Sequence, residues 1–265
     1  MVTINYKLQK IAENLFIKYK STEREYIDKK IINFKNSIKE YFGNKVNDIL
    51  VFGSYKRDTI LPRKYDEKSD IDVLIVFDQE ENEFTPETYR NQLIKFAEIK
   101  YPKTTRLKNH PSVVLEMSNI KFDLVPCRIK RSFWKDKYQI PDKTGDWMDT
   151  DPTGFNQDLT DANTRYSSIV KPIIRLLKCW NANSGYPYYS FDLEQIIADL
   201  NFKKNNYESG FLYAIENLPI DDLPDYQARR VETLKNNKDR IEDYLERENQ
   251  EKAMEVVYRI LGVKI

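Results

Sequence analysis

The spacing of apolar residues near the start of the chain predicts helices that pack along one face. Thr22 and Glu25 form a T-x-x-E capping box, which is typical of the beginning of a helix. The next apolar residues recur at intervals of four, three and four, as on one stripe of a helix: Ile27, Ile31, Phe34 and Ile38. We therefore expect residues 1–45 to be mainly helical.

Short apolar runs follow, and they predict buried strands. Ile49–Phe52 end at Gly53-Ser54, and Asp70–Phe77 are rich in β-branched side chains. Helical spacing returns over Pro86–Lys100, whereas the polar stretch Pro62–Lys68 is predicted to be a loop. Two more strands are expected to form a hairpin, namely Ser112–Leu115 and Ile120–Val125 around Ser118-Asn119.

The second half of the chain has a different pattern. Turn-forming residues dominate from Asp142 to Asp161, which predicts a long loop or a boundary between lobes. Apolar residues then keep helical spacing to the end, and Pro172 lies where the first turn of a helix tolerates proline. The pattern predicts an α+β protein, with a mixed sheet and helices in residues 1–150 and a helical lobe in residues 151–265.

Composition excludes several classes of protein. The 265 residues include 43 Lys and Arg against 42 Asp and Glu, and a net charge of +1 argues against a dedicated duplex-DNA binder. The single histidine, His110, which we expect in a loop, excludes a histidine-rich metal site. Two cysteines, Cys127 and Cys179, are too few to hold this fold by disulfides. The longest strongly apolar run, Val73–Phe77, is far shorter than the roughly 20 residues of a membrane span, so we expect a cytoplasmic protein without membrane contact.

Three aspartates and a Gly-Ser pair point to the chemistry. Asp70 and Asp72 are two apart in a predicted strand, so their side chains share one face. Carboxylates so close repel one another unless a cation lies between them, and oxygen ligands suit Mg²⁺. Asp123 lies in the strand expected beside them, and three acids can hold two metal ions. At Gly53-Ser54 the backbone can approach a phosphate closely, and the hydroxyl can bind its oxygens.

In this order the motifs resemble the DNA polymerase β-type nucleotidyltransferase superfamily, whose signature is Gly-Ser followed by Asp-x-Asp and a later Asp. More narrowly, the chain resembles the bacterial cGAS/DncV-like nucleotidyltransferases (CD-NTases of SMODS type), the cyclic-oligonucleotide synthases of antiphage signalling. The resemblance covers about residues 50 to 195. It is carried by Gly53–Thr59, F-D-L-V-P around Asp123, Trp147–Pro152, Lys171–Trp180 and Ser190–Glu194. It implies a two-lobed polymerase-β-like fold with the active site in the cleft between a catalytic lobe and a helical lobe that closes over the donor nucleotide.

The resemblance also implies roles for residues of the first lobe. Asp70, Asp72 and Asp123 would hold two Mg²⁺ ions, which Mn²⁺ can replace, and Asp123 would help to activate the acceptor hydroxyl. Gly53 and Ser54 would bind the donor nucleotide through its triphosphate.

For the helical lobe, the resemblance implies that Lys178 and Ser190 hold the phosphates from the opposite side. Phe191 occupies a position where relatives often have a Tyr that stacks on a base; phenylalanine keeps the ring and loses the hydroxyl. The residues alone favour a solvated helix face for Lys178 and the core for Phe191, and Arg175, on the same face as Lys178, fits either a phosphate clamp or a solvated face.

The function that the resemblance implies is the condensation of nucleoside triphosphates into a cyclic dinucleotide or oligonucleotide. The substrates would be ATP, GTP or both, with pyrimidine nucleotides left open. We expect a monomer that needs no nucleic-acid activator and whose product acts on a separate effector protein. Two alternatives remain: the same transfer to a tRNA 3′ end, a protein or a small molecule, or a non-catalytic nucleotide-binding scaffold, against which the presence of all three acids argues.

Overall fold

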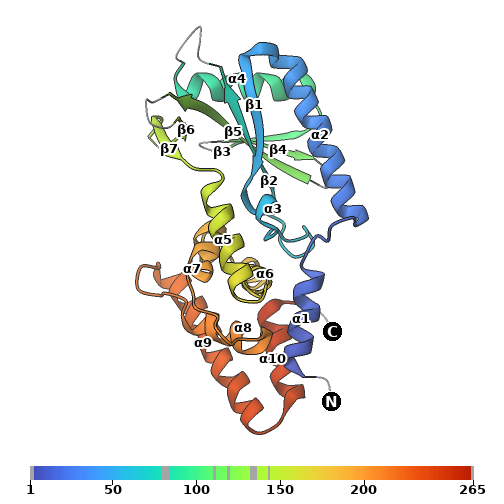
Figure 1. Ribbon diagram of the computed structural model, residues 1–265, viewed down its shortest axis with the longest axis vertical. Helices are drawn as coiled ribbons and strands as arrows, with labels where there is room; N and C mark the ends of the chain where they lie inside the picture. Colours follow the sequence, from blue (N-terminus) through green and yellow to red (C-terminus); the bar gives the residue numbers. More distant parts are fainter. Residues whose placement is uncertain are drawn as a thin grey trace. The chain divides into compact units, whose positions relative to one another are not determined.

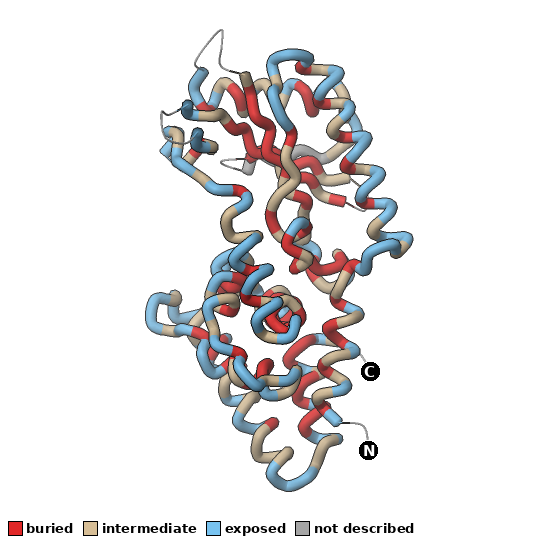
Figure 2. Tube along the Cα trace, in the orientation of Figure 1, coloured by how far each residue is buried: buried red, intermediate tan, exposed pale blue. Residues whose placement is uncertain are grey.

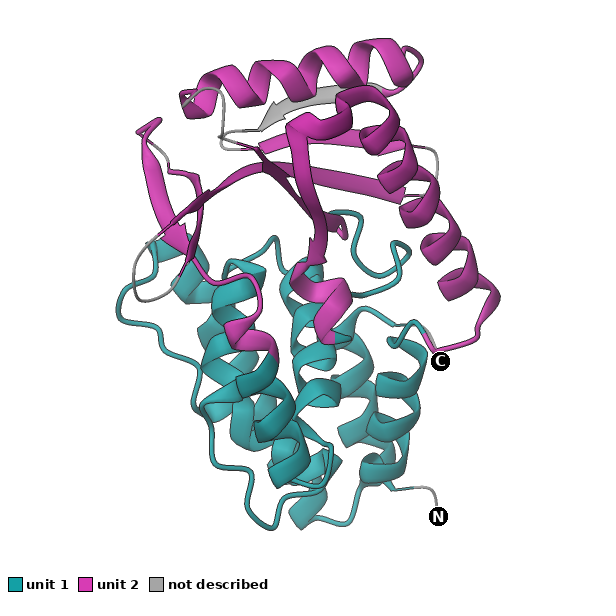
Figure 3. Cartoon of the chain, turned by 45° about the horizontal axis from the view of Figure 1, so that its top comes forward, with its two compact units in different colours: residues 1–17, 58–68, 157–265 teal, residues 18–57, 69–156 magenta. Residues whose placement is uncertain are grey.

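The computed structural model describes residues 3–78, 84–109, 112–117, 120–131, 136–142 and 144–263. Its contacts divide the chain into two compact units, each built from segments that are distant in sequence (Figure 3). The strand unit comprises residues 18–57 and 69–156, and the helical unit comprises residues 1–17, 58–68 and 157–265. The chain passes for the last time from the strand unit to the helical unit between residues 156 and 157, close to the boundary at residue 150 that the sequence predicts. The assignment of residues 1–17 and 58–68 to the first lobe differs from the structure, which places them in the helical unit.

Within the described residues, the strand unit contains a seven-stranded mixed sheet whose main path runs β1-β2-β5-β4-β3 (Figure 1). β2 and β5 are parallel, and the other neighbours are antiparallel. β6 pairs with the C-terminal end of β5, and β7 pairs with β6. The strands are β1 (Val46–Phe52), β2 (Ile71–Phe77), β3 (Thr105–Asn109), β4 (Ser112–Met117), β5 (Ile120–Lys130), β6 (Lys137–Pro141) and β7 (Trp147–Thr150).

Two helices, α2 (Thr22–Phe42) and α4 (Pro86–Lys100), pack on the sheet. Phe34 of α2 stacks on Phe122 of β5 with 4.5 Å between ring centroids, which shows that Phe122 points to the helix-covered face. The tube in Figure 2 is buried along the central strands and along the inner side of these helices. Because side chains alternate along a strand, Lys121 and Asp123 point to the opposite face.

The helical unit is organised around α6 (Val170–Asn183), whose residues 172–181 are all buried. Residues 58–68 belong to this unit because they bond to it: Arg175 Nη1 donates to the carbonyl of Asp58 at 2.9 Å, and the Tyr186 hydroxyl donates to Asp66 at 2.7 Å. The other helices are α1 (Ile4–Asn14), α5 (Gly154–Arg165), α7 (Ser190–Ala198), α8 (Tyr207–Glu216), α9 (Asp225–Glu246) and α10 (Gln250–Leu261), of which α5 begins in the strand unit.

Most elements that the sequence predicts are confirmed, and two details differ. The α2 stripe is buried, but the capping residue is Ser21, whose side chain accepts a hydrogen bond from the Arg24 N–H, so Thr22 is the first helical residue. The stretch from Asp142 to Asp161 is not a long loop, since it contains β7 and the first part of α5, but the change from the strand unit to the helical unit between residues 156 and 157 lies within it, in agreement with the alternative of a boundary.

The strands β3 and β6 were not predicted, because each is short and rich in polar residues. His110 and the turn residues Ser118-Asn119 lie outside the described part of the chain. Cys127 and Cys179 are buried free thiols. Among the described residues, no helix combines the length and the apolar character that crossing a membrane requires.

Candidate active site

The parallel pairing of β2 with β5 brings together the three aspartates that the sequence singles out. Asp72 and Asp123 are register partners, and Ile71 pairs with Phe122. Asp70 directly precedes β2, so it lies one residue before the Ile71–Phe122 pair, beside Lys121. Residues paired in register point to the same face, so Asp70, Asp72, Lys121 and Asp123 form two neighbouring rows on one face of the sheet. The expectation that Asp123 lies on the neighbouring strand is confirmed.

Asp123 is held in an environment that disfavours its charge. Burial raises the pKa of its carboxyl to about 6; the hydrogen bond from Ser112 lowers the pKa, the negative charge of Asp70 raises it, and Lys121 lowers it. One carboxylate oxygen, Oδ1, is buried and has no hydrogen-bond partner in the described part of the protein. A buried acceptor without a partner is costly, so Asp123 Oδ1 is a position at which a cation or a proton donor would be stabilised.

Gly53 is required because Asp72 lies directly against its backbone. Gly53 is the first residue of α3 (Gly53–Arg57) and has φ +70°, a conformation that residues with a Cβ rarely adopt. A Cβ built there would overlap Asp72 Oδ2 and would lie 2.6 Å from Asp72 Cγ. The glycine of the Gly-Ser motif therefore makes room for an acidic side chain on β2, and Ser54 follows it at the start of α3.

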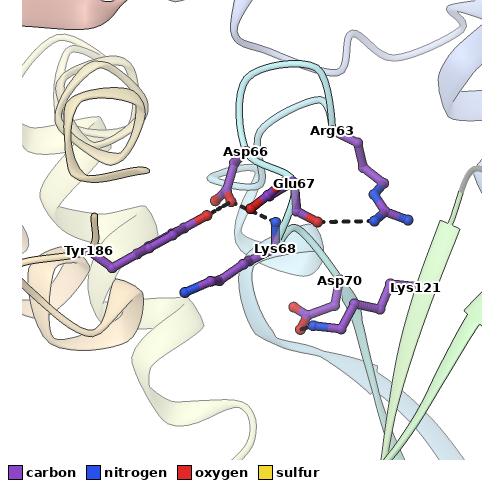
Figure 4. Close-up of polar contacts among 7 residues, drawn as sticks. All are labelled: Arg63, Asp66, Glu67, Lys68, Asp70, Lys121 and Tyr186. Atoms are coloured by element: carbon purple, nitrogen blue, oxygen red, sulfur yellow. Dashed lines mark hydrogen bonds and ion pairs between the residues drawn. The ribbon is translucent and has the colours of Figure 1, made fainter. Parts of the chain in front are cut away.

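Lys121 neutralises one of the acids. Its Nζ lies 3.2 Å from Asp70 Oδ2, and both side chains are largely shielded, with 18% and 28% of their surfaces exposed (Figure 4). Within the described ranges, no three His, Cys, Asp or Glu side chains are arranged so that they could hold a metal ion as they stand. The sequence reasoning missed Lys121, although its position two residues before Asp123 on the same predicted strand was a signal that it shares the face of the acids.

The helical unit contains the other predicted site residues, and here the structure corrects one expectation. Lys178 is not a surface lysine: its ammonium lies 2.7 Å from Glu194 Oε1, and only 5% and 1% of the two side chains are exposed. Thr59 donates a hydrogen bond to the same oxygen at 2.8 Å. Arg175 is buried as well, so neither basic residue belongs to a solvated helix face. Thr59 and Glu194 were not predicted, because the contacts that bury them join distant segments.

The positions of Ser190 and Phe191 leave both accessible. Ser190 begins α7 and is half-buried, and Phe191 has 44% of its surface exposed, so the alternative that Phe191 is a core residue is wrong. A hollow of about 420 Å³ in the helical unit is lined by residues 165–167 and 201–205, none of which is a predicted site residue.

The family model for the Second Messenger Oligonucleotide or Dinucleotide Synthetase domain (SMODS) matches residues 1–163 of this chain. The chain belongs to this family. A probable cyclic nucleotide synthase of Bacillus cereus (strain VD146) is 27% identical over 197 residues, which make up 62% of this chain. The match spans 58% of that relative, which is less than two thirds of its length.

Solved structures show that this SMODS chain has the fold of the bacterial CD-NTases. The CD-NTase CdnG of Bradyrhizobium diazoefficiens, in complex with GTP, is similar with a TM-score of 0.68 and 14% identity over 97% of each chain. CdnC of E. coli MS115-1 with ATP has a TM-score of 0.67 and 14% identity over 98% of this chain and 96% of CdnC. The α+β class, with a mixed sheet and a helical C-terminal part, is thereby confirmed.

Proposed function

We propose that this SMODS chain is a metal-dependent nucleotidyltransferase that joins nucleoside triphosphates into a cyclic dinucleotide or oligonucleotide. The observation that carries the proposal is the register of β2 and β5, which sets Asp72 beside Asp123 with Asp70 one row away. Like-charged side chains directly opposite one another on a sheet are destabilising, so a bound cation is the simplest reason to retain them.

The chemistry of the donor set suits a pair of Mg²⁺ ions, with Mn²⁺ as a substitute, although the described carboxylates are not arranged to hold an ion as they stand. All three donors are carboxylates, the ligands that Mg²⁺ prefers, and Asp123 Oδ1 is a buried acceptor without a partner. Asp70, Asp72 and Asp123 would hold the ions, and Asp70 must then exchange Lys121 for a metal. When bound, the metal ions supply charge stabilisation for the attacking oxygen and for the departing pyrophosphate.

The chain's own groups account for the remaining work. Asp123 also helps to activate the attacking ribose hydroxyl by accepting its proton. The hydroxyl of Ser54 binds phosphate oxygens, and Gly53 leaves space for Asp72.

The exposed ring of Phe191 stacks on a base of the nucleotide. Lys178 could reach a phosphate only by leaving Glu194, so we assign it to the packing of α6 on α7 instead.

The substrates we propose are ATP, GTP or both, with pyrimidine nucleotides left open. The support is that the similar structures of CdnG and CdnC were solved with GTP and ATP. The product would act on a separate effector protein in antiphage signalling, and the enzyme would be a cytoplasmic monomer. Transfer to a tRNA 3′ end, a protein or a small molecule uses the same chemistry and remains the second candidate.

The test is incubation of the protein with each labelled nucleoside triphosphate and Mg²⁺ or Mn²⁺, followed by phosphatase treatment and mass spectrometry. We expect a phosphatase-resistant cyclic product, which Asp72→Asn and Asp123→Asn should each abolish. The matched control is Glu40→Gln, which removes a charge from an exposed acid of α2 and should leave the product unchanged. Label transferred only to added RNA or protein would favour the second candidate, and no turnover with any acceptor would refute the proposal.

A further inference from the structure

A lysine occupies the acidic face on which the metal site is proposed. Lys121 donates a hydrogen bond to Asp70 Oδ2 at 3.2 Å (Figure 4). The negative charge of Asp70 acts in turn on Asp123. Since Lys121 and Asp123 are two residues apart on β5, their side chains share a face. Lys121 is therefore built into the same row of side chains as the carboxylates.

The strand on the other side of β5 adds a further acid. Glu116 of β4 is the register partner of Lys121, and Val114 is the register partner of Asp123. The lysine thus stands between Asp70 on one neighbouring strand and Glu116 on the other, in a row that alternates in charge across the sheet. The next row contains Val114, Asp123 and Asp72, in which two acids are adjacent and no lysine is present.

Charge balance explains why a lysine belongs there. Without any cation, Asp70, Asp72 and Asp123 would repel one another in a partly shielded environment, where repulsion is stronger than in water. With a divalent ion on Asp70, the lysine ammonium a few ångströms away would be repelled in its turn. The Lys121 ammonium and a divalent ion repel each other when both lie at Asp70, so the presence of the ammonium weakens binding of the ion.

We propose that Lys121 is an internal counter-cation that neutralises Asp70 in the metal-free protein and that a divalent metal ion displaces. This inference rests on the proposed function, since it requires that Asp70 bind metal. Lys121 is a positioning residue: it keeps the acidic face assembled before metal binds, and it lowers the affinity of the site for free metal ions.

The measurement is the affinity for Mn²⁺ in the absence of nucleotide, from electron paramagnetic resonance of the unbound ion. In Lys121→Gln the competing charge is gone, and we expect Mn²⁺ to bind about tenfold more tightly than in the wild type. Lys121→Arg keeps the charge and should show no such gain. Lys130→Gln, which removes a charge from the exposed end of the same strand, is the matched control and should bind as the wild type does.

Equal or weaker Mn²⁺ binding by Lys121→Gln would overturn the inference, because the lysine would then coexist with the metal or support it. Asp70→Asn separates this failure from failure of the proposed function. If Asp70→Asn abolishes Mn²⁺ binding while Lys121→Gln leaves it unchanged, the metal site stands and the competition does not. If the wild type and Lys121→Gln both fail to bind Mn²⁺, the metal site itself is refuted.

A second measurement on the wild type keeps the inference testable should Lys121→Gln fold poorly. Acetic anhydride labels exposed amines, and mass spectrometry reports the extent at each lysine. Displacement by Mn²⁺ predicts that labelling of Lys121 rises when Mn²⁺ is added, while labelling of the remote Lys100 on α4 stays constant. Unchanged labelling of Lys121 at a saturating Mn²⁺ concentration would overturn the inference.

Discussion

Replacing Gly53 by alanine should damage the strand unit through its contact with Asp72. Gly53 has φ +70°, and an added Cβ would overlap Asp72 Oδ2 and approach Asp72 Cγ to 2.6 Å. The positive φ alone costs an alanine about 1–2 kcal/mol. Forcing the overlapped side chain aside adds about 1–3 kcal/mol, as for an overpacked site. Because the backbone of Asp72 is paired with Phe52 of β1 and Asp123 of β5, the strand is not free to shift, and the overlap must be relieved by the Asp72 carboxylate or by α3.

The matched control is Gly145→Ala in the same unit. Gly145 also has a positive φ, +95°, but a Cβ there would have no atom within 4 Å. Gly145→Ala therefore reports the backbone strain without the overlap. We expect Gly53→Ala to lower the free energy of unfolding by about 3 kcal/mol and Gly145→Ala by about 1 kcal/mol.

The assay is urea unfolding followed by far-ultraviolet circular dichroism, with metal removed by a chelator so that only the fold is tested. Asp72→Ala supplies a second check, because it removes the two overlapped atoms and should relieve part of the loss when combined with Gly53→Ala. Equal losses for Gly53→Ala and Gly145→Ala, to within about 0.5 kcal/mol, would refute the argument that Gly53 makes room for Asp72.

Three further predictions follow from the same structure. Burial raises the pKa of Asp123 from 3.8 to about 6, so between these pH values the folded protein binds more protons than the unfolded chain. The free energy of unfolding of the metal-free protein should therefore fall by about 3 kcal/mol as the pH rises through this window. Urea titrations at several pH values test this, and Asp123→Asn should remove the pH dependence. Lys178→Met should leave the buried Glu194 carboxylate without the positive charge of Lys178 and destabilise the protein by about 3–5 kcal/mol. Lys178→Met combined with Glu194→Leu should recover much of the loss in thermal melts, and an exposed lysine would show neither effect. Ser21→Ala should lower the free energy of unfolding of the strand unit by about 1 kcal/mol, because α2 loses its N-terminal cap. Thr22→Ala should change it by less than about 0.5 kcal/mol. A larger loss for Thr22→Ala than for Ser21→Ala in urea titrations would contradict the assignment of the cap.

The sequence by itself determined the features that depend on near neighbours. The stripe of Ile27, Ile31, Phe34 and Ile38 predicted a helix with one buried face, because helical periodicity is a local property of the chain. The spacing of Asp70 and Asp72 predicted that they share a face, since side chains alternate along any strand. Local pattern was weakest where polar residues form short strands, as in Thr105–Asn109 and Lys137–Pro141, because pairing with neighbouring strands stabilises those segments more than their own composition does.

Tertiary structure alone decided which distant residues meet. The register of β2 on β5 sets Asp72 beside Asp123 and Lys121 beside Asp70, across 51 positions of sequence, and a shift of one residue would have turned one set of these side chains to the helix-covered face. The burial of Lys178 likewise depends on Thr59 and Glu194, which arrive from separate segments of the helical unit. The periodicity of the sequence does not predict such long-range contacts, because they depend on the tertiary packing of the whole unit. The sequence therefore identified the acids, and only the folded sheet showed that a lysine already neutralises one of them.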